Sequence, residues 1–288
     1  MGALRVLHAE ARRLFHRRAA WFTGMALCAV AFLGTWSNRL AASARHGAMV
    51  RQALIDGREA PPPPPPENAY GPWLDGWAAG APVATLLLLV LAARSLAGDV
   101  ESGLARQALV RGASRAHQVL GRALLGLGLV PAFVVLTGLG SFVGAAVFFA
   151  FGDLRIDGAL VLTEAEMRGD LPLAVLSLLP PLFAAWCFGL FVSSIARTGV
   201  TALVATLLPF LAFDLFKEAL GEFRTYVFAS FTPSLIDKSN LRETAGVVRG
   251  FFDKGYGEDL LRANFVVPLP QALLLIALAL VLHARRPL

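Results

Sequence analysis

Residues 94–125 read RSLAGDVESGLARQALVRGASRAHQVLGRALL and separate two long apolar runs. An excess of arginine beside apolar runs of membrane-spanning length is typical of a cytoplasmic loop. Apolar residues recur between the charges until Gly112, Ala113 and Ser114 interrupt them. This pattern predicts a short amphipathic helix, a break, and a second helix that enters the bilayer. The basic residues of the stretch are Arg94, Arg106, Arg111, Arg115 and Arg122, and its acidic residues are Asp99 and Glu101.

The composition of the whole chain indicates a protein that crosses a membrane several times. Of its 288 residues 56% are hydrophobic, and the mean hydropathy is +0.62, whereas soluble domains are usually about 45–50% apolar. The excess lies in long uninterrupted runs, as in transmembrane helices. We therefore predict an all-α membrane protein with six transmembrane helices, an amino-terminal interfacial helix, and short outer helices between spans five and six. The expected spans are residues 19–36, 77–93, 120–151, 171–195, 200–216 and 266–283.

The distribution of charge predicts the orientation of these spans. The net charge is +6, and the segments that we place inside hold half of the 26 basic residues but few of the 20 acidic ones. Basic residues concentrate on the cytoplasmic side of membrane proteins. We therefore expect both termini and residues 94–120 in the cytoplasm. The outer segments would be residues 37–76, 152–170 and 217–265.

Residues 1–18 predict the interfacial helix, because arginines and histidine lie opposite a face of leucine and alanine. A plain basic flank is the alternative. A cleaved signal peptide is the other interpretation of the apolar run that follows, since Ala42-Ser43-Ala44 resembles a cleavage site. That run is longer than the apolar core of about 7–15 residues that signal peptides have. We therefore expect the first span to stay in the protein.

The loop at residues 94–120 resembles the cytoplasmic loop after the second span of type-2 ATP-binding-cassette (ABC) permeases. That family shows an acidic residue, a glycine, a leucine-rich helix, and then Pro-x-Ser-Arg before a Gly/Ala–Lys/Arg pair. Gly112 stands near the family's usual proline, which is a departure from the pattern. Six spans in the expected order extend the resemblance to a single permease domain over residues 1–288. The matching residues are Glu101, Gly103, Leu104, Leu109, Ser114-Arg115 and Gly121-Arg122.

The resemblance implies a membrane subunit that works with a separate cytoplasmic ATPase subunit and with a second permease copy or a related chain. The chain itself would hold no cofactor, since ATP and Mg²⁺ would bind to the partner ATPase. The resemblance also implies the bacterial inner membrane, and the large outer segments suggest a protein partner on the outer face. An ordinary positive-inside loop is the alternative interpretation of residues 94–120. The residues to which the resemblance assigns ATPase coupling are Glu101, Gly103, Arg111, Ser114, Arg115 and Arg122.

The sequence carries no recognisable catalytic motif of its own. It has no Gly-Lys dipeptide, and therefore no phosphate-binding loop of the G-x-x-x-x-G-K-[ST] type. Cys28 and Cys187 lie in different apolar runs, which predicts neither a disulfide nor a metal site. Asp214 is the one acidic residue that we place within a span, where acidic residues are candidates for transport. Lys217 lies three residues later, so a structural ion pair on one helix face is the other interpretation.

These observations favour an ABC permease subunit and leave two alternatives. One is a non-transporting membrane scaffold that holds an envelope complex, and the other is a secondary transporter. A proton-coupled transporter would need acidic or histidine side chains in its spans, and Asp214 is the one candidate in the sequence. The basic net charge does not indicate nucleic-acid binding, because the topology accounts for the positions of the arginines.

Overall fold

The computed structural model describes residues 2–16, 18–60, 62, 68–110, 112–156, 159–234 and 264–286. Six of its helices are long and apolar enough to cross a membrane, which confirms the predicted all-α membrane protein with six spans. In chain order the described elements are α1 (Gly2–Phe15), α2 (Arg18–Ile55), α3 (Tyr70–Glu101), α4 (Leu104–Val110), α5 (Arg115–Phe148), β1 (Leu154–Ile156), β2 (Ala159–Leu162), α6 (Glu164–Ile195), α7 (Gly199–Phe216), η1 (Lys217–Tyr226), η2 (Phe228–Phe231) and α10 (Pro268–Arg285).

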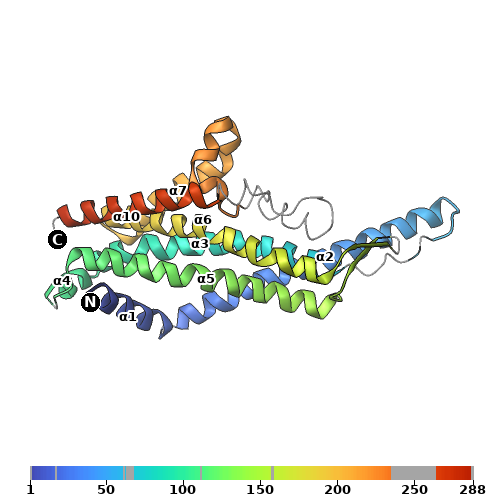
Figure 1. The fold of residues 1–288 in the computed structure, drawn as a ribbon, viewed down its shortest axis with the longest axis horizontal. Coiled ribbons are helices and arrows are strands. Elements are labelled where there is room, and N and C mark those ends of the chain that lie inside the picture. The colour runs from blue at the N-terminus through green and yellow to red at the C-terminus, as the bar shows by residue number, and fades with distance from the viewer. Residues whose placement is uncertain are drawn as a thin grey trace.

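The helices form an elongated bundle in which both chain ends lie at the same end (Figure 1). The short helix α4 lies at this end too, whereas the hairpin of β1 and β2 lies at the opposite end (Figure 1). This arrangement agrees with the prediction that the termini and the loop at residues 94–120 share one side of the membrane. We call the end with the termini and α4 the α4 end.

Helix α2 is much longer than the span expected from the sequence. Its 38 residues correspond to about 57 Å at 1.5 Å per residue, against about 30 Å for the hydrocarbon layer of a bilayer. The sequence predicted residues 19–36 as the first span and residues 37–76 as an outer segment. The helix continues without a break from the expected span to Ile55, because residues 37–55 contain no proline and are rich in alanine and arginine, which favour helix. The first helix therefore continues well beyond the membrane.

Helix α3 lies at the centre of the bundle and packs against α2, α5, α6 and α7. Its leucines Leu88 and Leu89 are fully buried. Glycines of α3 and α5 bring neighbouring helices close, as small residues do in membrane proteins. A Cβ atom on Gly140 would lie 2.3 Å from the carbonyl oxygen of Cys28 in α2, and one on Gly126 would lie 2.3 Å from the Trp186 ring in α6. At these two positions any larger side chain would separate the helices.

The segment between α5 and α6 contains structure that the sequence analysis did not predict. Strands β1 and β2 pair antiparallel, and they are too short to give a periodic pattern. Helix α6 begins at Glu164, seven residues before the expected start of the fourth span. Thr163 caps this helix in a capping box with Glu166, and the backbone hydrogen bond from Thr163 lowers the pKa of the Glu166 carboxyl. The acidic residues Glu164 and Glu166 of this segment therefore lie in the first turn of a helix.

The segment after α7 was predicted to form short outer helices. Two short 3₁₀-helices follow α7 directly, η1 and η2, which confirms short helices in this part of the segment. Residues 235–263 of the predicted outer segment lie outside the described residues.

Candidate functional site at the α4 end

Helix α4 is joined to its neighbours by two glycine turns. Gly103 follows α3 with a φ angle of 74°, and Gly112 follows α4 with a φ angle of 82°, values that glycine adopts without strain. After α4, the Gly112 amide donates to the Leu109 carbonyl and the Ala113 amide to the Ala108 carbonyl, which is the Schellman pattern of a helix end. Gly112 therefore ends α4, as the proline of the resembled pattern could also do. Arg111, which the resemblance assigned to coupling, lies outside the described residues.

Ser114 begins the next helix, α5. Its hydroxyl oxygen accepts a hydrogen bond from the His117 amide at 3.2 Å, and the His117 ring accepts one from the Ser114 amide at 3.4 Å. These reciprocal bonds form a capping box, which satisfies amides that the first helical turn leaves without partners. The serine of the motif thus has a local structural role, since it sets where α5 starts.

Glu101, the last residue of α3, holds the start of α7. Its Oε2 atom accepts a hydrogen bond of 2.8 Å from the backbone amide of Gly199, the first residue of α7. A carboxylate at a helix amino terminus is favourable, because the amide groups there carry partial positive charge. The structure therefore links the residue before the Gly103 turn to a helix that is distant in sequence.

Arg115 and Arg286 join the ends of three further helices. The Nη1 atom of Arg115, in α5, donates to the carbonyl of Ala284 at 2.8 Å and also to the carbonyl of Arg286, at the end of α10. Arg286 donates in turn from Nη2 to the Ala196 carbonyl at 2.7 Å, just after α6. Burial, with the positive charge of Arg197 nearby, lowers the pKa of the Arg286 guanidinium. In the isolated chain, the guanidinium of Arg115 is thus bonded to α10.

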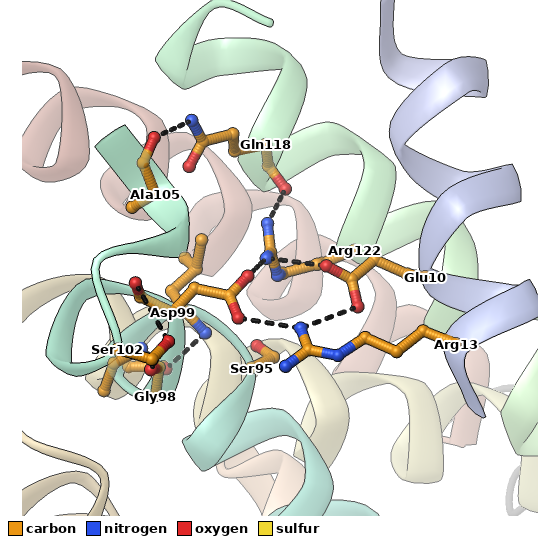
Figure 2. A network of polar contacts seen from close by, with 12 residues as sticks. Glu10, Arg13, Ser95, Gly98, Asp99, Ser102, Ala105, Gln118 and Arg122 are labelled. Atoms are coloured by element: carbon orange, nitrogen blue, oxygen red, sulfur yellow. Dashed lines mark hydrogen bonds and ion pairs between the residues drawn. The ribbon is translucent and has the colours of Figure 1, made fainter. Parts of the chain in front are cut away.

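Arg122 is buried in a group of four charged side chains that we call the inner charge cluster, formed with Glu10, Arg13 and Asp99. Its Nη2 atom lies 2.9 Å from Glu10 of α1 and also pairs with Asp99 of α3. Arg13 of α1 donates to the other Asp99 oxygen at 2.9 Å, and this bond raises the pKa of the Arg13 guanidinium. Figure 2 shows the four side chains pointing toward one another from three helices. The cluster fastens α1 to α3 and α5.

Sequence reasoning singled out Arg122 but did not connect it with Glu10, Arg13 and Asp99. A signal was present, because Glu10 and Asp99 are two of the few acidic residues in segments that are otherwise basic. An acidic residue within an arginine-rich segment is a candidate partner for a buried arginine.

A cavity of about 650 Å³ opens at the α4 end, between α4 and the turn that joins α6 to α7. We call it the arginine cavity, because its lining includes Arg106, Arg197 and Arg286. The acidic residue in the lining is Glu101. Arg106 and Arg197 are exposed, and within the described part of the chain neither has a hydrogen bond or an ion pair. The cavity therefore offers unused guanidinium donors to a negatively charged group.

Asp214 lies apart from this group, near the other end of α7. Its carboxylate lies 3.2 Å from the Lys217 ammonium group and accepts a hydrogen bond of 2.7 Å from Ser234. Both members of the ion pair are buried, with Asp214 8% and Lys217 3% exposed. The structure contains the ion pair that was one of the two interpretations of Asp214, and the pair fastens the start of η1 to α7.

Within the described residues, histidine, cysteine, aspartate and glutamate form no group of three that could hold a metal ion. In comparisons with known proteins, a family model described as ABC-2 family transporter protein matches residues 14–261. The match runs from the end of α1 to a point before α10 and includes α4 and its two glycine turns. No curated protein matches the chain.

Proposed function

The chain belongs to the ABC-2 transporter family, and from this premise we propose that it is the permease subunit that couples ATP hydrolysis by a separate ATPase subunit to export or to another envelope process. Two copies, or this chain and a related one, would pair with two ATPase subunits. ATP and Mg²⁺ would bind to those subunits. The α4 end would face the cytoplasm of a bacterial cell across its inner membrane, and the opposite end would face an outer protein partner.

The observation that carries this proposal is the arginine cavity beside α4. Arg106 projects from α4 itself, and Arg197 lies on the turn before α7. Both are exposed and unpaired within the described part of the chain. A guanidinium group can make several directed bonds to carboxylates or carbonyls, so an acidic surface on an ATPase subunit would fit here.

The links around α4 suggest how a push from the ATPase would reach the membrane. Displacement of α4 acts on α3 through the Gly103 turn and on α5 through the Gly112 turn. At the end of α3, Glu101 holds the start of α7, and at the start of α5, Arg115 holds the end of α10. Movement of this seven-residue helix would therefore shift the ends of four spans together.

Co-purification tests the proposal. The chain would be isolated from native membranes in mild detergent, and bound proteins identified by mass spectrometry. We expect an ATPase subunit to be retained, and the double variant Arg106→Glu/Arg197→Glu to lower its retention at least about tenfold, which corresponds to about 1.4 kcal/mol. The control is Arg58→Glu, an exposed arginine of the outer segment, which should leave retention unchanged.

Two outcomes contradict the proposal. Absence of any ATPase from the native complex would favour the membrane scaffold, and equal retention by wild type and double variant would remove the arginine cavity from docking. Arg115→Glu would not test docking alone, because it would also release the end of α10.

A further inference from the structure

A second cavity, of about 400 Å³, lies between α1, α3, α5 and α6. We call it the amphipathic cavity, because its wall changes from apolar to charged along α3. Leu91 lines its apolar part, and Arg94, Ser95 and Asp99 line its polar part. At 1.5 Å per residue, Leu91 and Asp99 are about 12 Å apart along the helix axis. The apolar part is continued by Leu125 of α5.

The polar part of the cavity is lined by three arginines but only two acidic residues, so it carries one excess positive charge. The inner charge cluster contributes two arginines and two carboxylates, which pair with one another (Figure 2). Arg94 adds a further guanidinium group. It is exposed, and within the described part of the chain it has no hydrogen bond or ion pair. Among the residues that line the cavity, a ligand group with a single negative charge would balance the charge of Arg94.

One side of the cavity lies within the packed bundle, whereas Arg94 in its polar part is exposed. Arg122, which lines it, is 3% exposed, and its carbonyl accepts a hydrogen bond of 3.0 Å from the ring of Trp186, which lines the cavity from α6. The wall therefore has a fixed shape, with charges held in place at one end and packed apolar side chains at the other.

The position of Arg94 in the chain places the polar part at a membrane surface. The apolar run of α3 ends at Ala93, and the headgroup layer adds only about 5–7 Å to each side of the hydrocarbon. Over its length of about 12 Å the lined face of α3 thus crosses from hydrocarbon to headgroups. A phosphodiester carries one negative charge in that layer, with apolar chains directly beside it. Basic pockets between helices bind lipid headgroups by this chemistry.

We propose that the amphipathic cavity binds an anionic phospholipid, with its phosphate at Arg94 and one acyl chain along Leu91 and Leu125. The lipid fills the space between α1 and α3, and its phosphate balances the charge of Arg94. The residues that line this cavity differ from those that line the arginine cavity, so the lipid site does not depend on ATPase docking.

Photolabelling tests the proposal. The protein, reconstituted in nanodiscs, would be exposed to phosphatidylglycerol or phosphatidylcholine that carries a photoreactive group near its phosphate, and labelled peptides would be mapped. We expect phosphatidylglycerol to label the part of α3 around Arg94. The variant Arg94→Gln should lower this labelling about tenfold, whereas Arg94→Lys should keep most of it. The control is Arg58→Gln, an exposed arginine that lines neither cavity, which should leave this labelling unchanged.

A second variant, which keeps Arg94, tests the site if the loss of Arg94 impairs folding. Ser95→Phe places a bulky side chain into the cavity without changing charge, and it should displace the lipid to a similar degree. Labelling that is equal for both lipids and insensitive to Arg94→Gln and Ser95→Phe would overturn the proposal. Millimolar inorganic phosphate that competes as well as phosphatidylglycerol would assign a free-anion site instead. Disulfide formation between copies at Leu91→Cys, without lipid labelling, would show that a second copy covers the cavity. Either of these results also overturns the proposal.

Discussion

Replacement of Arg122 by alanine should destabilise the protein strongly, although no ligand contact is removed. The Arg122 side chain is 4% exposed and pairs with the carboxylates of Glu10 and Asp99, which are 20% and 11% exposed. Without it, these carboxylates lose their buried cation. Removal of one partner from a buried ion pair costs about 3–5 kcal/mol. Arg13 keeps its bond of 2.9 Å to Asp99 and is 38% exposed, so we expect a loss near the lower limit, about 3 kcal/mol.

Equilibrium unfolding in mixed micelles, with an increasing fraction of denaturing detergent, measures this loss. Arg106→Ala is the matched control, because Arg106 is exposed and unpaired within the described residues, and it should cost less than about 0.5 kcal/mol. Adding Glu10→Gln to Arg122→Gln should recover part of the loss, since it removes the carboxylate that has lost its closest cation. A cost for Arg122→Ala as small as that of the control would refute the reasoning. It would mean that the carboxylates reach water and that the cluster does not fasten α1.

Two further predictions concern the ends of the bundle. Glu101→Gln should leave α7 inserted but increase hydrogen exchange at the Gly199 amide, because a neutral amide oxygen is a weaker acceptor than a carboxylate; unchanged exchange there would contradict the assigned link. Cysteines placed at Ala116 and Gly47 should show opposite accessibility to a membrane-impermeant reagent in intact cells, with Gly47→Cys labelled and Ala116→Cys labelled only after lysis; the reverse pattern would invert the proposed orientation.

The number and order of the spans could be predicted because apolar length and arginine position are properties of the sequence itself. Helix boundaries outside the membrane could not be predicted in this way. The end of α2 at Ile55 depends on helix-forming residues that look polar in a hydropathy profile, and the start of α6 depends on the cap at Thr163. Both helices continue into polar segments, where low hydropathy does not mean that the helix has ended.

The candidate site was predicted in part for a related reason. The sequence pointed to Glu101, Arg115 and Arg122 as a group, and the structure places all three near the α4 end. Their partners could not be predicted, because each contacts a helix distant in sequence: α7, α10 and α1 respectively. Such pairings depend on the packing order of the helices, which a periodic pattern does not contain.

The partners at the α4 end bear on how any coupling motion would spread. Helix ends are usually the least stable parts of a helix, because their last amides or carbonyls lack partners within the helix. Here charged side chains from other elements fill that need, with Glu101 at α7, Arg115 at α10 and Arg286 at the end of α6. A displacement at α4 that breaks one of these bonds leaves a helix end without its partner, whereas a displacement that keeps them moves the ends together. The second course costs less free energy, so concerted movement of these ends is the expected response to a subunit that binds at α4.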